Sequence, residues 1–198
     1  MKTKTIHIEL PPWVENYLAD AGEIYPTREG RMALAVGLSR RNIEERTGGP
    51  FGAAVFDRAG GKLIAVGVNL VTTVGLSFAH AEMVAVMQAQ AALGGFDLGG
   101  PGMPECELVS STEPCAMCLG AVPWSGVRSL VCGAADGDAR AAGFDEGSKR
   151  GDWARELEAR GIAVALGVLR EEAAAVLRDY AAGGGAVYNG RRGGAPQR

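Results

Sequence analysis

The chain has 198 residues, which is enough for one compact domain with a full hydrophobic core. Hydrophobic residues make up 47% of it, which excludes intrinsic disorder, and the sequence has no run of about 18 apolar residues that would predict a membrane span. The formal net charge of -3 has the wrong sign for a protein that binds nucleic acid through phosphate contacts.

The first half of the chain predicts a helix, a β-hairpin and a second helix. Residues 29–46 look like an amphipathic helix with a charged end, which "GGPF" terminates. Two short apolar runs, "GAAVFD" and "KLIAVGVNLV", are separated by "RAGG", a pattern typical of a hairpin. The next helix is expected from about His80 to Leu93.

The second half alternates strands with helices. A Gly- and Pro-rich loop leads into the strand "ELVSS", and a short helix follows from about Cys115 to Ser125. The strands "VRSLVCGA" and "IAVALG" then alternate with helices near 152–160 and 171–182. This order predicts a mostly parallel sheet with helices on both faces. In such sheets, sites lie where strands end and helices begin, as His80 and Cys115 are expected to do.

Three side chains have the types and spacing of zinc ligands. Cys115 and Cys118 are three residues apart, so both sulfurs point to one face of a helix that begins near Pro114. The imidazole of His80 would complete a set of three protein ligands. Three ligands leave the fourth tetrahedral position for water, which is typical of a catalytic zinc site.

Glu82 lies two residues after His80, at the start of an otherwise apolar helix. A carboxylate beside a water that zinc activates can take its proton and pass it to the substrate. We therefore expect Glu82 to be the general acid–base.

The two motifs identify a family. His80-x-Glu82 followed by Pro114-Cys115-x-x-Cys118 is the signature of zinc nucleobase deaminases. The chain resembles the cytidine-deaminase-like superfamily and, within it, bacterial guanine deaminases. The resemblance rests on "AHAEMVAV", "EPCAMCLGAVPWSGVRSLVCGA" and "GFDEG", with "GGPFGAAVFD" and "VYN" in agreement.

The resemblance implies a three-layer α/β/α fold with a five-stranded mixed sheet and one Zn²⁺ per chain. It implies hydrolysis of guanine to xanthine and ammonia, and close relatives act on ammeline, an aminotriazine. In the loop "GFDEG", residues 143–147 and called the acidic loop below, it assigns the functional carboxylate to Glu146 rather than Asp145. Alone, "GFDEG" would be interpreted as a solvated turn.

Other residues are expected to bind the base. Phe51 heads a strand and offers a flat wall, and Phe144 would stack on the ring from the opposite side. An amide is unusual in a strand, so we expect Asn69 to bind the purine edge, in agreement with the resemblance. The backbone N–H of Ala81 and the side chain of Tyr188 complete the expected binding residues.

The sequence is also compatible with other functions. Cys106 and Cys132 could form a four-cysteine structural zinc module with Cys115 and Cys118, although His80 and Glu82 would then be unexplained. A bare C-x-x-C pair could be a redox motif. Among enzymes, the alternatives are a cytosine, cytidine or other nucleobase deaminase and a tRNA adenosine deaminase, which should carry a basic surface.

The sequence also gives expectations for the two ends of the chain, for the cellular compartment and for binding partners. We expect one deaminase domain with an N-terminal extension over about residues 1–25. The Gly-rich tail, from about 183–198, is expected to be a flap over the site, with a disordered terminus as the alternative. The cysteines and the lack of a signal peptide predict a cytoplasmic protein. Its partner would be a small nucleobase, with no nucleic acid or membrane, and the resemblance implies a homodimer.

Overall fold

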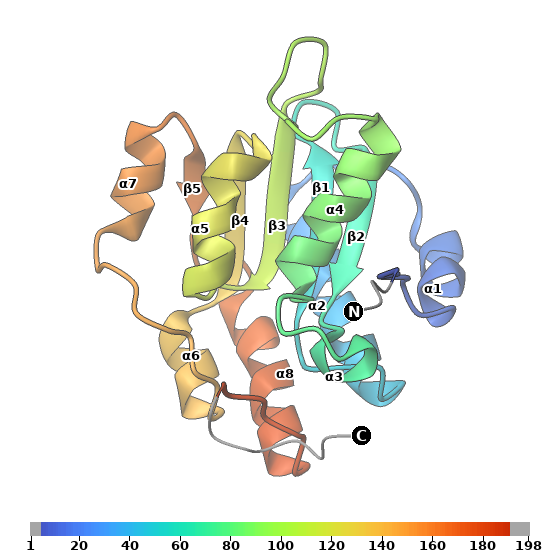
Figure 1. The fold of residues 1–198 in the computed structure, drawn as a ribbon, viewed down its shortest axis with the longest axis vertical. Coiled ribbons are helices and arrows are strands. Elements are labelled where there is room, and N and C mark those ends of the chain that lie inside the picture. The colour runs from blue at the N-terminus through green and yellow to red at the C-terminus, as the bar shows by residue number, and fades with distance from the viewer. Residues whose placement is uncertain (1–4, 191–198) are drawn as a thin grey trace.

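The computed structural model describes residues 5–190, which are built around one five-stranded sheet (Figure 1). The strands are Gly52–Asp57 (β1), Leu63–Val68 (β2), Cys106–Thr112 (β3), Ser129–Ala134 (β4) and Ala163–Ala165 (β5). Their order in the sheet is β2-β1-β3-β4-β5, and β1 is antiparallel to both of its neighbours, whereas β3, β4 and β5 pair in parallel. The sheet is therefore mixed, with β1 alone running in the opposite direction.

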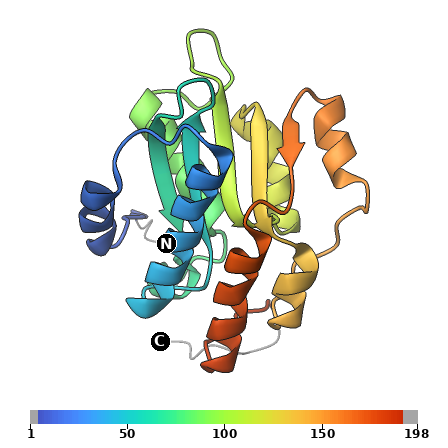
Figure 2. The ribbon, with the colours of Figure 1, turned by 180° about the vertical axis from the view of Figure 1, so that it is seen from behind.

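Helices cover both faces of this sheet. Those described are Trp13–Ala21 (α1), Arg28–Glu44 (α2), Val71–Val74 (α3), Ala81–Leu93 (α4), Ala116–Ser125 (α5), Asp136–Ala141 (α6), Trp153–Ala159 (α7) and Arg170–Ala182 (α8). Figure 1 shows α4, α5 and α7 in front of the strands, and Figure 2 shows α2 and α8 over the opposite face. This is the three-layer α/β/α arrangement that the family resemblance implies.

Alternating side chains of the strands feed two hydrophobic cores. In β1, Ala53 and Val55 pack on the α4 side of the sheet, and Ala54 and Phe56 pack on the α2 side. All four are fully buried. Both faces of the strand are covered, which explains why its sequence is a continuous apolar run.

Two glycines let helices approach the sheet closely near the site. A Cβ on Gly67 of β2 would lie 2.2 Å from the carbonyl oxygen of Ala81, in the first turn of α4. A Cβ on Gly52 of β1 would lie 2.4 Å from the carbonyl oxygen of Ala35 in α2. A side chain at either position would push the helix away, so these glycines fix where α2 and α4 lie on the sheet.

The direction of β1 brings the loop before it to the edge of the sheet where β2 and β3 end. Gly52 at the start of β1 is paired with Val68 at the end of β2, and Ala53 is paired with Ser110 near the end of β3. The loop before β1 therefore lies beside the loops that follow the parallel strands. This is the edge at which sites of open α/β sheets are found.

The expected elements are all present, and three helices were not expected. The expected ends are correct to within one or two residues for β1 and for the helices α2, α4, α5, α7 and α8. The second strand, β2, ends at Val68, three residues before the end of the expected run. The helices α1, α3 and α6 are additions, and α3 and a turn separate β2 from His80, so His80 does not directly follow a strand. No helix between residues 5 and 190 is both long and apolar enough to cross a membrane.

Candidate active site

The three expected metal ligands meet at the edge of the sheet described above. His80 is the N-cap residue of α4, Cys115 is the N-cap residue of α5, and Cys118 lies in the first turn of α5. Their ligand atoms all lie within 4.8 Å of one another, and Nδ1 of His80 is 3.5 Å from Sγ of Cys115. The positive ends of two helices therefore point to the place where the three ligands converge.

The donor set fits zinc. Two sulfurs and one imidazole nitrogen are ligands that Zn²⁺ prefers, and three protein ligands leave one position open. A hydrogen bond from the Cys118 thiol, together with the His80 ring, lowers the pKa of the Cys115 thiol to about 4. One of the two sulfurs is thus a thiolate at neutral pH, in the state that binds a metal.

The four-cysteine structural site is ruled out by the geometry. Cys106 begins β3 and Cys132 lies within β4, and both are fully buried free thiols in the core under α4 and α5. Within residues 5–190, His80 joins Cys115 and Cys118 in the only group with metal-ligand spacing, and neither strand cysteine belongs to it.

Glu82 lies in the first turn of α4 beside these ligands. Its side chain lines the same cleft as His80 and Cys115, although only 8% of the residue is exposed. Burial raises the pKa of the Glu82 carboxyl. A carboxyl group that meets the cleft through a small opening is placed to exchange a proton with a molecule bound there.

Most of the expected base-binding residues line this cleft. The walls include Phe51, Asn69, Phe144 and Tyr188, which come from four different segments of the chain. Ala81 is the exception among the expected residues: it is the fully buried first residue of α4 and is not part of the wall. Its backbone N–H is at a helix start, where no carbonyl of the same helix can accept from it, so its role stays a prediction.

The two phenylalanine rings form a corner rather than two facing walls. Their centroids are 4.9 Å apart and their planes meet at 76°, which is an edge-to-face contact. Phe144 also stacks against Tyr180, at 6.2 Å and 20°. The two rings contact each other in this arrangement, and the expectation that they enclose a base stays a prediction. A flat ligand can contact the corner that they share.

The sequence suggested that Asn69 lies within the second strand. In the structure it directly follows the end of β2. Its backbone N–H donates to the carbonyl of Phe51 at 3.1 Å, and its Oδ1 accepts from the N–H of Val71 at 3.3 Å. The residue is only 8% exposed and lines the cleft. Because Oδ1 already has a partner, the amide nitrogen is the group left to donate to a ligand.

The acidic loop faces the cleft with Glu146, which is 5% exposed, and with Asp145. Burial, reinforced by the nearby Cys115 sulfur and opposed by Lys149, raises the pKa of the Glu146 carboxyl to about 7. Asp145 has a local task, since its Oδ1 accepts from the N–H of Gly147 at 3.0 Å. The structure therefore gives the two acids different surroundings, with Glu146 the more deeply buried.

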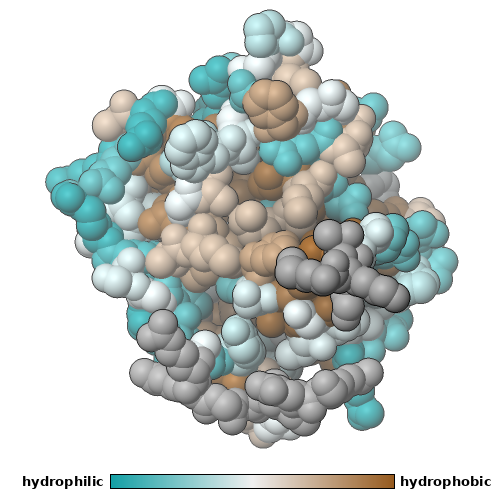
Figure 3. Space-filling model, in the orientation of Figure 1, coloured by the Kyte–Doolittle hydropathy of each residue, from teal (hydrophilic) through white to brown (hydrophobic). Residues whose placement is uncertain are grey.

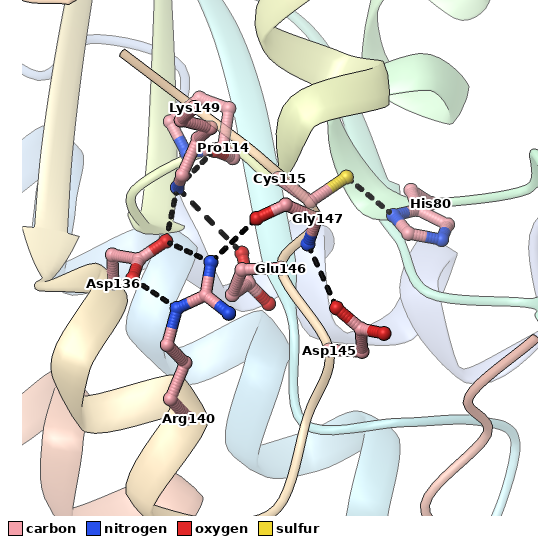
Figure 4. A network of polar contacts seen from close by, with 9 residues as sticks. All are labelled: His80, Pro114, Cys115, Asp136, Arg140, Asp145, Glu146, Gly147 and Lys149. Carbon is pink, nitrogen blue, oxygen red and sulfur yellow. Dashed lines mark hydrogen bonds and ion pairs between the residues drawn. The ribbon is translucent and has the colours of Figure 1, made fainter. Parts of the chain in front are cut away.

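Polar contacts hold the acidic loop against the start of α5 (Figure 4). The Nζ of Lys149 lies 2.7 Å from the carbonyl of Pro114 and 2.6 Å from Oδ1 of Asp136, and Nη2 of Arg140 donates to the carbonyl of Gly147 at 2.7 Å. Pro114 precedes a metal ligand, so one network joins the metal-binding turn to the loop that carries Glu146.

The described part of the tail contacts the same loop. Asn189 accepts from the N–H of Asp145 at 2.8 Å and donates to the carbonyl of Gly143 at 2.9 Å. Tyr188, which is 41% exposed, and Ala186 line the cleft. The tail up to Gly190 therefore packs at the cleft. Residues 191–198 of the expected flap, and residues 1–4 of the extension, lie outside the described residues.

Several residues of the cleft were not expected from the sequence. They are Gly49, Val71, Thr72 and Glu113. Glu113 carried a usable signal, because it directly precedes the metal-binding turn at the end of β3. The others reach the cleft through loop geometry, which no residue type in the sequence indicates.

Known proteins resemble this chain over most of its length. Residues 26–134, more than half of the chain, match the family described as the zinc-binding region of cytidine and deoxycytidylate deaminases. The guanine deaminase of Bacillus subtilis is 40% identical over 115 residues, which are 58% of this chain and 69% of that protein.

Two solved structures are similar in fold as well as in sequence. The structure of the guanine deaminase from Nitrosomonas europaea is 49% identical, with 92% of this chain and 99% of that chain covered and a TM-score of 0.84. The structure of NE0047 in complex with 2,6-diaminopurine is 50% identical, with 94% and 98% covered and a TM-score of 0.86.

Proposed function

Because the chain belongs to the family of zinc-binding cytidine and deoxycytidylate deaminases, and is a hydrolytic deaminase, we propose that its substrate is guanine. The reaction consumes water and releases xanthine and ammonia. One observation carries the choice of guanine: two buried carboxyl groups, that of Glu82 in the first turn of α4 and that of Glu146 in the acidic loop, line one cleft.

Guanine requires proton transfer on two sides of its amine. The amine is attached to C2, between the ring nitrogens N1, which carries hydrogen, and N3, which does not. Cytosine has only one ring nitrogen beside its amine-bearing carbon. A cleft with one carboxyl group for each neighbouring nitrogen therefore suits guanine better than cytosine.

The zinc that His80, Cys115 and Cys118 would hold supplies Lewis-acid activation of water at the amine-bearing carbon. Glu82 takes a proton from the attacking water and transfers it to N3, which makes C2 more electrophilic. Its position in the first turn of α4 keeps the carboxyl group beside the ligands throughout the reaction.

Glu146 works from the N1 side. Its carboxylate accepts the N1–H of guanine and helps to deliver a proton to the leaving amine, which must depart as ammonia. With a pKa of about 7, the group can both hold and release a proton near neutral pH. Lys149 and the backbone contacts of the loop keep it close to the metal-binding turn.

The remaining residues of the cleft orient the base. Asn69 donates its amide N–H to an acceptor on the far purine edge, and the corner of Phe51 and Phe144 contacts the flat ring. The N–H of Ala81 donates to a ring acceptor at the start of α4. Tyr188 covers the ligand from the tail, which excludes water from the reacting atoms.

A substrate panel scored by ammonia release tests this function. Purified protein is given guanine, ammeline, cytosine, cytidine, guanosine, adenosine and a tRNA with an adenosine in its anticodon. We expect guanine to have the highest kcat/KM, with ammeline as a weaker second substrate because it carries the same amine between two ring nitrogens. Faster release from cytosine, cytidine or tRNA would contradict the assignment and favour the corresponding rival deaminase.

We also propose that the protein is a homodimer of the cytoplasm with a role in purine metabolism. Exposed apolar side chains on and beside α4 and α5, namely Phe96, Met117 and Trp124, support self-association. Figure 3 shows apolar residues across the middle of this face. Four free thiols suit a reducing compartment. Sedimentation equilibrium of the wild type and of Trp124→Glu checks the dimer, which the variant should dissociate.

A further inference from the structure

Asn42 lies in α2, outside the cleft, and its side chain is fully buried. Its Nδ2 donates two hydrogen bonds, to the carbonyl of Gly49 at 2.8 Å and to the carbonyl of Asn69 at 2.9 Å. Backbone carbonyls only accept, so the amide nitrogen must be the atom that faces them. One side chain thus joins two loops, the one before β1 and the one after β2, and both loops line the cleft.

The amide oxygen of Asn42 is linked through Thr47 to the N-terminal extension. The Oδ1 of Asn42 accepts from the hydroxyl of Thr47 at 2.7 Å, and that hydroxyl accepts from the indole N–H of Trp13 at 2.9 Å. Trp13 belongs to α1, which lies outside the segment that matches the deaminase family. A chain of hydrogen bonds therefore runs from α1 through α2 to the two loops.

The two loops are in direct backbone contact where Asn42 joins them. A Cβ on Gly48 would lie 1.7 Å from the carbonyl oxygen of Asn69, so only glycine fits there. The backbone N–H of Asn69 donates in turn to the carbonyl of Phe51. Any displacement of the loop before β1 must therefore move Asn69.

We propose that Asn42 is a positioning residue that sets the place of Asn69 in the cleft, and that Thr47 and Trp13 hold Asn42 in its orientation. The inference rests on the proposed function, because it assumes that Asn69 binds the base. The metal ligands and Glu82 come from α4 and α5, which the Asn42 amide does not contact. Loss of the amide should therefore weaken binding of the base and leave the chemical step nearly intact.

A double-mutant cycle between Asn42 and Asn69 tests the inference. Asn42→Leu keeps the branched shape and removes the polar atoms, and Asn69→Ala removes the proposed contact with the base. Kinetics with guanine are measured for both single variants and for the double variant. We expect Asn42→Leu to raise KM by about tenfold or more, the loss typical of a hydrogen bond, with kcat within about threefold. In the Asn69→Ala background the same change should have almost no further effect on KM, since a positioning residue acts through its target.

A matched control separates positioning from stability. Ser129 of β4 donates to the buried carboxylate of Glu107 at 2.8 Å, where β3 and β4 begin, at the end of the sheet away from the cleft. Ser129→Ala should lower the melting temperature without changing KM. Thr47→Val and Trp13→Phe keep the shape and ring packing of their residues and should raise KM in the same direction by smaller factors. They carry the test if Asn42→Leu does not fold.

Two results would overturn the inference. One is a double variant, Asn42→Leu or Thr47→Val combined with Asn69→Ala, whose KM increase equals the product of the two single-variant increases. The other is an equal KM shift in Ser129→Ala at an equal loss of melting temperature. Absence of ammonia release from guanine by the wild type would count against the proposed function instead. The cycle would then be measured with whichever base of the panel is deaminated, under the same criterion.

Discussion

The metal-binding end and the base-binding end of the cleft are built differently. The metal ligands and Glu82 lie at the starts of α4 and α5, two helices that pack on the same face of the sheet. The residues that we propose to bind the base come from the loop before β1, the loop after β2, the acidic loop and the tail. The metal ligands and Glu82 therefore lie in short motifs at helix starts, whereas the proposed base-binding residues lie in loops that the whole fold brings together.

The largest loss of activity is expected from a substitution of Glu82. Glu82→Gln should keep the fold and the metal, because Glu82 is not among the ligands, but it removes the carboxyl group that we propose moves the protons. We expect kcat to fall by about 10⁴-fold or more, at the upper end for general acid–base catalysis. Steady-state kinetics and metal analysis of the same sample check this. Turnover within about tenfold of the wild type would mean that another group carries the protons.

Glu146 tests whether chemistry extends into the loop-built end. Glu146→Gln should lower kcat by roughly 10²-fold, in line with the loss of a second acid–base group. Asp145→Asn is the matched control from the same loop, and it should matter less because Asp145 accepts mainly from Gly147. If both variants turn over guanine like the wild type, the loop serves only as a wall.

Asn69 tests recognition without chemistry. Asn69→Ala should raise KM by about tenfold, as expected for one lost hydrogen bond to a bound ligand, and leave the zinc content unchanged. Kinetics with guanine and metal analysis give both values. A fall in kcat with an unchanged KM would move Asn69 from binding to the chemical step.

The tail should give the smallest effect of the four. Removal of residues 184–198 deletes Tyr188 and the two hydrogen bonds of Asn189, and it should lower kcat/KM several-fold while the melting temperature changes little. Asn189→Ala cuts only the two hydrogen bonds and should have a milder effect in the same direction. An unchanged kcat/KM in the truncated protein would refute the flap.

Much of the fold could be predicted from the sequence because the strands are bounded apolar runs. The strand "GAAVFD" matches β1 residue for residue, and the helices α4 and α8 were expected within one residue. The missed helices lack such a signal: α3 is one turn rich in β-branched residues, and α6 is a short polar segment that contains Gly137. The hairpin of β1 and β2 could be predicted from the turn between them, but the antiparallel pairing of β1 with β3 is not visible in the residues of either strand.

In the candidate site, the metal-binding end could be predicted from the sequence, whereas the arrangement of the loop residues could not. The ligands and Glu82 could be located because metal chemistry dictates residue type and spacing. The arrangement of Phe51 and Phe144 could not, since an edge-to-face contact depends on where two distant loops meet. Asn42 could not be identified for another reason: the groups that it joins in the two loops are backbone carbonyls, which every residue carries.

A zinc ion at His80, Cys115 and Cys118 is expected to make guanine deamination possible in this cleft. The most direct test is to strip the protein of metal, return zinc in steps and follow xanthine formation from guanine. We expect no turnover in the stripped protein and a linear rise to a maximum at one zinc per chain, because the three ligands form one open site. Turnover that persists with less than about half a zinc per chain would contradict this expectation.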